Sequence, residues 1–300
     1  MTTTFRAAGV ETLRRAARDS SGALLLAGAC LAGGLLIGVS LPRELVDVLS
    51  AYGVIVPIAI ASAAAANATA VGGGFVFMPL FSLGYGLGGH ATLALSLSTQ
   101  AFGMTSGALG WSLASIDRRA LLVACATSGA GMLLGTLVVT PAEETIRTAF
   151  AWGSLAVAAA MVAMLWVPTT GAPRPRTRMD DWLFAVACAL GGLITAWVAI
   201  GIGEVVALWL MFRWRASAGT AIATGVAALA FCSVLGLVCH AALGAVPWIY
   251  LAFTAPSVVL GGRLGARLGR RLEAAGRGHW LKALVAVVIA LDGAVMFVHA

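Results

Sequence analysis

The chain has 300 residues, of which 60% are hydrophobic and 10% are charged, whereas soluble domains carry about 25% charged residues. Apolar runs of about 18 residues or more recur from one end to the other, which indicates a polytopic membrane protein and excludes two ordinary soluble domains. The net charge of +7 comes from arginines in short loops between these runs. That pattern is typical of cytoplasmic loops, and it predicts no nucleic-acid partner.

Residues 1–53 are expected to form a basic cytoplasmic N-terminus and one extra span. Residues 1–20 contain four arginines, and residues 22–39 form an apolar run without a convincing small-x-small cleavage site. We therefore interpret the run as an uncleaved membrane anchor rather than a signal peptide.

The apolar stretch at 54–87 is interrupted near its centre by Asn67 and the glycine triplet 72–74. It is too long for one crossing and too short for two crossings of about 20 residues each. Unpaired backbone groups cost several kcal/mol each in hydrocarbon, so protein or a watery cavity must cover such a break. A re-entrant hairpin with arms at 54–66 and 75–87 fits the length, and a packing kink or a plain loop is the alternative.

The two halves of the chain have the same order of segments. In the first half three ordinary spans follow the break, at 90–111, 120–139 and 145–167. A polar, arginine-containing linker at 168–181 then leads to a second broken stretch at 182–212 and to spans at 217–240, 248–268 and 280–298. A shift of about 130 positions aligns Gly72 and Gly74 with Gly201 and Gly203. Weak internal repeats of this kind are typical of transporters.

The arginines favour hairpins over single crossings at the two breaks. If both broken stretches return to the side they start from, the basic segments lie inside and the loop with Glu143 and Glu144 lies outside. If each break crossed once, Arg118 and Arg119 would lie outside. Three full spans per repeat then make the two repeats inverted. The predicted fold is all-α and polytopic, with an extra span (1–53), repeat 1 (54–167), the linker (168–181) and repeat 2 (182–300), in the cytoplasmic membrane with the N-terminus cytoplasmic.

The chemistry of the two breaks predicts a site for a small anion. Each second arm begins at glycines, and a helix N-terminus leaves backbone N–H groups unpaired and carries about half a positive charge. Glycines let an anion approach those N–H groups. Ser and Thr in membrane helices often bond only to their own helix, whereas an amide has more bonding groups than its helix satisfies. The candidate substrate-binding residues are Asn67, Gly72, Gly73, Gly74, Ser96, Thr99, Gln100, Gly201, Gly203 and Thr224.

Two acidic residues within apolar stretches are candidates for proton coupling. Glu204 lies at the second glycine break, and Asp292 lies in the last predicted span. Intramembrane acids mark functional sites by default, and a carboxyl that titrates during transport couples anion movement to protons. The alternatives are that Glu204 pairs with Arg213 or Arg215 and that Asp292 only lines a hydrated surface. No metal-binding spacing occurs, and no cofactor is expected.

The chain resembles the TauE/SafE family, the sulfite-exporter and sulfonate-permease group of anion transporters. The resemblance rests on the run from Val71 to Pro79, on the run from Ala221 to Thr224, and on 244–248 and 261–268; it covers roughly residues 55–298. It implies transport of a small sulfur-containing anion, coupled to protons or sodium. The partners expected are this anion and membrane lipid. Formation of a homo-oligomer is a further alternative.

The second break departs from the family pattern. It reads Gly201-Ile202-Gly203-Glu204, without a proline where Pro79 maps. An anion channel or a membrane assembly factor is the alternative function. An intramembrane enzyme is less favoured, because the chain has no G-x-S-x-G, no H-E-x-x-H and no paired intramembrane aspartates.

Overall fold

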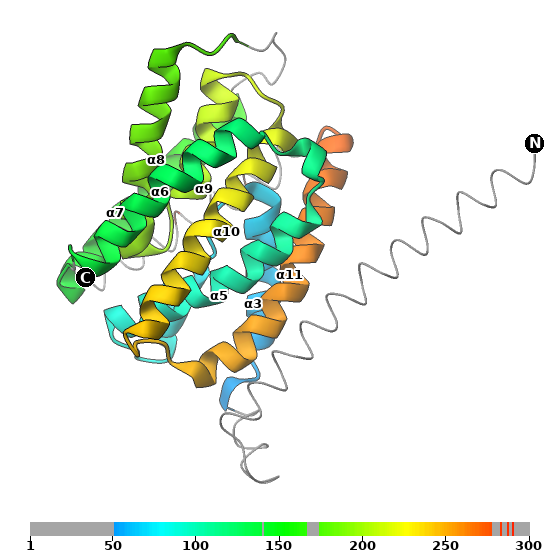
Figure 1. The fold of residues 1–300 in the computed structure, drawn as a ribbon. Helices are drawn as coiled ribbons and strands as arrows, with labels where there is room; N and C mark the ends of the chain where they lie inside the picture. Colours follow the sequence, from blue (N-terminus) through cyan, green and yellow to red (C-terminus); the bar gives the residue numbers. More distant parts are fainter. Residues whose placement is uncertain are drawn as a thin grey trace, which may run out of the picture.

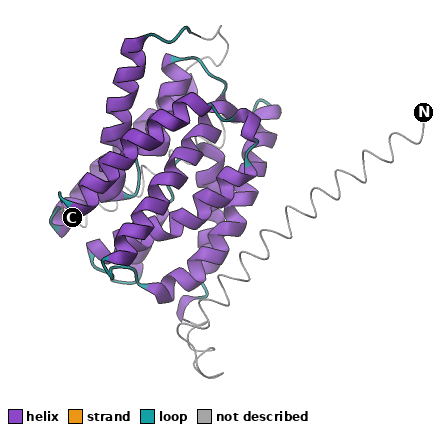
Figure 2. Ribbon diagram, viewed as in Figure 1, coloured by secondary structure: helices purple, strands orange, loops and turns teal. Residues whose placement is uncertain are grey.

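The computed structural model describes residues 51–139, 141–166 and 174–277, with Ala283, Val287 and Ala290 beyond them. The predicted first span, most of the last span and Asp292 lie outside these residues. Within them all regular structure is helical (Figure 2). The expectation of an all-α membrane protein is confirmed at this level, because α6, α8, α10 and α11 are long and apolar enough to cross a membrane.

The first half consists of α3 (Ile55–Thr69), α4 (Gly74–Pro79), the π-helical turn η1 (Leu80–Gly84), α5 (Gly89–Gly110), the short η2 (Leu113–Ser115), α6 (Arg118–Leu137) and α7 (Glu143–Trp166). The second half consists of α8 (Arg178–Val198), α9 (Ile202–Leu208), the π-helical turn η3 (Trp209–Arg213), α10 (Ala218–Ala242) and α11 (Trp248–Ala274). Figure 1 shows them as one helical bundle with α3 beside α11.

The ends of α3 and α8, where the two breaks begin, have the same backbone conformation. Ala70 and Ala199 end α3 and α8 in the left-handed region, with φ of 62° and 56°. These alanines are 129 positions apart (199 minus 70), as are the starts of η1 and η3 (209 minus 80) and of α5 and α10 (218 minus 89). Alanine rarely adopts this conformation, so its occurrence at both breaks shows that the local fold is repeated.

The π-helical turns do not depend on proline. Pro79 lies directly before η1, but η3 follows Leu208 and has the same length. The missing proline of the second half therefore does not change its local structure.

The first arms are longer than the sequence predicts. α3 continues to Thr69 instead of ending near position 66, because Asn67 and Thr69 donate side-chain hydrogen bonds to the carbonyls of Ala63 and Ala65, one turn back. α8 begins at Arg178, where Thr177 and Asp180 form a capping box. At 21 residues it is a full-length helix rather than a half-helix.

Both broken segments end close to where they begin. After η1, Tyr85 donates a hydrogen bond to the carbonyl of Ala51 (3.3 Å) and stacks on Tyr52. After η3, Trp214 accepts a hydrogen bond from the N–H of Arg174 (3.2 Å), just before α8. Each contact places the end of a broken segment beside its start.

Glycines allow the long helices to pack closely in equivalent pairs. α3 packs on α11, and α8 packs on α6. A Cβ atom at Gly265 of α11 would overlap the carbonyl of Ala64, and one at Gly131 of α6 would overlap the carbonyl of Ala189. Such contacts are the usual basis of helix association in membranes.

Candidate functional site where the two helix breaks meet

The tips of the two broken segments contact each other through their backbones. A Cβ atom added to Gly72 or Gly74 would lie 2.7 or 2.8 Å from the carbonyl oxygen of Ala199. A Cβ atom added to Gly203 would lie 2.5 Å from the carbonyl oxygen of Ala70. Glycine is therefore needed at these positions for contact between the two breaks, because the space over each one is filled by the other break.

The Glu204 carboxylate joins the two breaks. One oxygen accepts a hydrogen bond from the backbone N–H of Gly72 (2.7 Å), 132 positions away in the first half. The other accepts from the N–H of Gly201 (3.0 Å), which is common for a glutamate in the first turn of a helix. The side chain is buried, with 6% of its surface exposed. Arg213 pairs with Asp180 instead, at 2.5 Å, so the alternative in which Glu204 pairs with Arg213 is wrong.

Gly201 is the one glycine among the predicted site residues whose backbone conformation itself favours glycine. Its φ is 143°, a region that other residues rarely adopt. This turn directs its N–H toward the Glu204 carboxylate. It also brings the N–H of Ile202 to the hydroxyl of Thr195, at 3.0 Å.

The amides of Asn67 and Gln100 use their donors and leave their acceptors unpaired. Asn67 donates to the carbonyl of Ala63 (2.8 Å), and Gln100 donates across the interface to the carbonyl of Ala199 (2.8 Å). The side-chain oxygen of each has no hydrogen-bond partner, although both residues are buried. An anion requires donors, and each of these amide nitrogens has a second N–H beside the one that is bonded.

A small cavity lies beside the first break. Its lining includes the predicted site residues Asn67, Gly73, Thr99 and Gln100. The volume is about 10 Å³, close to the least that holds one water molecule. Four of the expected residues therefore share one cavity, but it has no room for a sulfur oxyanion in this conformation.

The remaining predicted residues have different positions. The hydroxyl of Ser96 is buried without a partner. Thr224 bonds to its own helix and to the loop before α6. Its hydroxyl donates to the carbonyl of Thr220 (2.7 Å) and accepts from the N–H of Asp117 (3.0 Å). Neither residue lines the cavity.

Two threonines of the site were not found from the sequence. Thr254 on α11 shares a hydrogen bond of 2.8 Å with the hydroxyl of Thr99. Thr195 on α8 accepts from the N–H of Ile202 and donates to the carbonyl of Gly191 (2.7 Å). Each lies inside an apolar run with no adjacent motif. For Thr195 the only available signal is its position six residues before Gly201, where the second glycine break begins.

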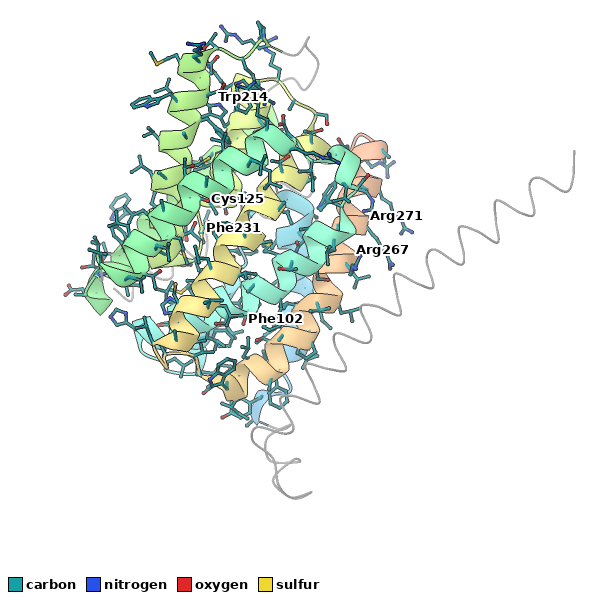
Figure 3. The ribbon with its side chains drawn as sticks, in the orientation of Figure 1. Phe102, Cys125, Trp214, Phe231, Arg267 and Arg271 are labelled. Carbon is teal, nitrogen blue, oxygen red and sulfur yellow. The ribbon has the colours of Figure 1, made fainter. Side chains whose placement is uncertain are left out.

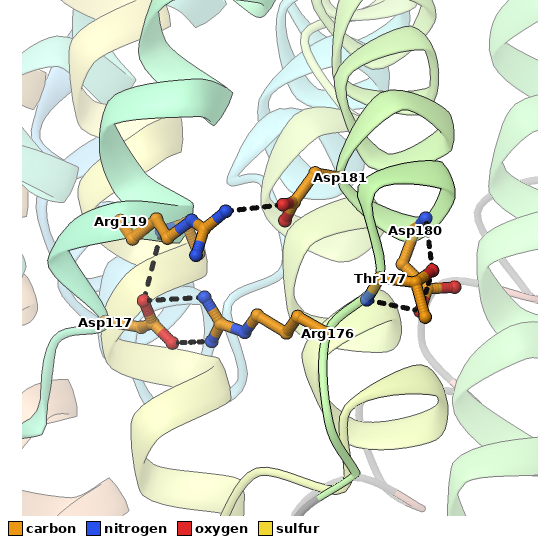
Figure 4. Close-up of polar contacts among 7 residues, drawn as sticks. Asp117, Arg119, Arg176, Thr177, Asp180 and Asp181 are labelled. Atoms are coloured by element: carbon orange, nitrogen blue, oxygen red, sulfur yellow. Dashed lines mark hydrogen bonds and ion pairs between the residues drawn. The ribbon is translucent and has the colours of Figure 1, made fainter.

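A cluster of ion pairs connects the loops at one end of the bundle (Figure 4). We call these residues the ionic cluster: Asp117, Arg119, Arg176, Asp180, Asp181 and Arg213. Figure 4 labels all of them except Arg213. Arg176 pairs with Asp117, and its guanidinium lies 4.0 Å from the centre of the Trp214 ring. The cluster joins the start of α6 to the start of α8 and the end of η3.

Asp117 both caps α6 and pairs with Arg176. Burial alone would raise the pKa of its carboxyl, but hydrogen bonds from Arg176 and from the N–H of Ala120, with the Arg176 charge, hold the pKa below its ordinary value. A lowered pKa stabilises the fold above the ordinary aspartate range, and this contribution is lost as the pH falls through the lowered pKa.

Replacing Asp117 by alanine is expected to lower stability by about 1–2 kcal/mol, because it removes the N-cap of α6 and leaves Arg176 without its partner. The wild type loses stability at acidic pH as Asp117 takes up a proton, and the variant should lose less stability over the same pH range. Thermal unfolding in detergent, measured across pH, tests both the lower stability and its weaker dependence on pH. Asp181→Ala is the matched control: its partner Arg119 has a side chain 67% exposed, so almost no change is expected. Equal losses in the two variants would contradict this account.

Comparison with known proteins gives one match. The family model described as "Sulfite exporter TauE/SafE" matches residues 54–296. No curated protein and no solved structure matches the chain. The matched range contains both breaks and every described helix, and the family is one of membrane transporters. The resemblance seen in the sequence is confirmed: the chain belongs to the TauE/SafE sulfite exporter family.

Proposed function

We propose that the protein is a secondary transporter of a small sulfur-containing anion, of the sulfite or sulfonate class, in the cytoplasmic membrane. The observation that carries the proposal is the binding of the Glu204 carboxyl group by N–H groups of both breaks, Gly72 and Gly201. Hydrogen bonds from N–H groups to an anionic oxygen are about twice as strong as neutral ones. The same N–H groups therefore suit the oxygens of a substrate anion, and family membership supplies the substrate class.

The transport path requires the two halves to be inverted repeats with re-entrant hairpins. The contacts of Tyr85 with Ala51 and of Trp214 with Arg174 support re-entry, because each places the end of a broken segment beside its start. The ionic cluster supports orientation, because it gathers the loops that the positive-inside rule assigns to the cytoplasm. Alternating access follows from movement of one repeat against the other around the point where the two breaks meet.

In this mechanism the substrate anion replaces Glu204 at the N–H groups of Gly72 and Gly201. Two anions cannot share these donors, because like charges at about 4 Å repel by several kcal/mol near a protein surface. A proton on Glu204 removes its charge, weakens its hold on the N–H groups and makes them available to the substrate. Glu204 is thus the proposed site of proton coupling. Asp292 is a further candidate for proton coupling, and sodium is the alternative coupling ion.

Binding also requires the cavity beside the first break to open. At about 10 Å³ it excludes the substrate, and one N–H of each of the Asn67 and Gln100 amides is bonded to a backbone carbonyl. Gln100 holds the carbonyl of Ala199, so movement of the second break releases its donor toward the site. In this conformation the cavity is therefore closed to the substrate.

Saturable, protein-dependent flux of sulfite or a sulfonate into proteoliposomes is the expected result that tests the proposal. The purified protein should also melt at higher temperature with increasing concentration of its substrate, among sulfite, sulfoacetate, taurine, thiosulfate and carboxylates, since stabilisation follows the logarithm of ligand over dissociation constant. Flux that never saturates would favour a channel. No flux and no dose-dependent shift with any of these anions would contradict transport.

A further inference from the structure

We propose that α11 carries a binding site for the phosphate of an anionic phospholipid, formed by Arg267 and Arg271 with Arg263 at its border. No feature of the transport site is used in this inference. Figure 3 shows Arg267 and Arg271 extending outward from α11. The three arginines are four positions apart, so they lie on one side of the helix.

The same side of α11 has an apolar surface suited to acyl chains. Leu260, Leu264 and Leu268 are 44%, 41% and 40% exposed, although the opposite side of the helix packs on α3 and α5. At helical spacing these leucines alternate with Arg267 and Arg271 along one exposed strip. An apolar surface beside a pair of guanidinium groups matches the two parts of a phospholipid.

The length of α11 places the arginines at the level of lipid headgroups. Trp248, the first residue of the helix, is 46% exposed, and tryptophan prefers the membrane interface. The 20 steps along the helix from there to Leu268 rise about 30 Å, which is the thickness of the hydrocarbon core. Arg271 and the last turn of α11 therefore lie in the opposite headgroup layer, and Arg267 reaches it by extending its side chain.

These two arginines have no protein partner within the described residues. Arg263 donates to the carbonyl of Leu109 (3.2 Å), whereas no ion pair or side-chain hydrogen bond is found for Arg267 or Arg271 in the part of the chain that the structure describes. The acidic residue nearest in sequence, Glu273, accepts instead from the N–H of Gly219 (2.6 Å). A lipid phosphate supplies the missing anion and accepts from a guanidinium fork in two hydrogen bonds.

The test compares binding of phosphatidylglycerol with binding of phosphatidylcholine of the same acyl chains to the full-length protein, by native mass spectrometry and by thermal shift. The wild type is expected to retain phosphatidylglycerol preferentially. Arg267→Gln with Arg271→Gln should weaken its binding by about fivefold for each arginine, hence about 25-fold in the double variant. Phosphatidylcholine binding should not change.

The matched control is Arg118→Gln with Arg178→Gln, which removes the same charge from two exposed first residues of α6 and α8. It should keep most of the preference for phosphatidylglycerol. Equal loss in both double variants would overturn the proposal in favour of general surface attraction. A change of oligomeric mass without loss of lipid in Arg267→Gln with Arg271→Gln would overturn it in favour of a protein partner. Unchanged melting of both variants without lipid confirms that they fold.

Discussion

Replacing Gly203 by alanine is expected to destabilise the protein by about 1–3 kcal/mol or more and to abolish anion flux. The new Cβ atom would lie 2.5 Å from the carbonyl oxygen of Ala70, a backbone atom that cannot move without separating the two breaks. Overpacking of this kind costs about 1–3 kcal/mol. Helix propensity predicts the opposite sign, because glycine inside a helix such as α9 is about 1 kcal/mol less favourable than alanine.

Gly153→Ala in α7 separates the effect of overpacking from the effect of helix propensity. There the nearest atom to an added Cβ is 4.0 Å away, on Val198, so propensity alone acts and stability should stay the same or rise. Thermal unfolding and proteoliposome flux of both variants provide the comparison. If Gly203→Ala unfolds at the temperature of the wild type and transports at its rate, the contact between the breaks is not part of the working structure.

Replacing Glu204 by glutamine is expected to flatten the pH dependence of transport. Glutamine has the same size and no charge, but it offers one acceptor oxygen for two N–H groups. Binding of the substrate then no longer depends on protonation at this position. Flux of the preferred anion into proteoliposomes, measured over a range of pH, is the readout.

Glu273→Gln is the control for this substitution. Glu273 also accepts from a backbone N–H, that of Gly219 at 2.6 Å, but at the end of the bundle. Its pH profile should match that of the wild type. A pH profile of Glu204→Gln that also matches the wild type would remove Glu204 from proton coupling and leave it a structural link between the breaks.

The repeat made the positions of both breaks predictable, because glycines at matching places are visible in the sequence. The same alignment could not show that Glu204 reaches Gly72. Its counterpart in the first half is Phe75 (204 minus 129), so the contact has no equivalent across the repeat, and its partner is a backbone N–H that no residue type reveals. The ends of α3 were also hidden, since Asn67 and Thr69 extend the helix by bonding to it.

The polar residues illustrate a second limit of the sequence. Gln100 was expected to serve the anion, but the sequence could not show which of its groups is free. In the structure its donor is bound to Ala199 and its acceptor is unpaired. The position of Thr224 on the span after the break predicts a role in anion binding. In the structure its hydroxyl instead accepts a hydrogen bond from the N–H of Asp117 in the loop before α6. Periodicity places a residue on a helix, whereas hydrogen-bond direction depends on neighbours distant in the sequence.

The most direct test of the central claim, that substrate and Glu204 compete for the same N–H groups, is the affinity for sulfite of wild type and Glu204→Gln at neutral pH. Isothermal calorimetry of the purified proteins would measure it. The competition predicts binding about tenfold tighter or more in the variant, because a fixed negative charge at the site is removed. Equal or weaker binding in a folded Glu204→Gln protein would contradict the account.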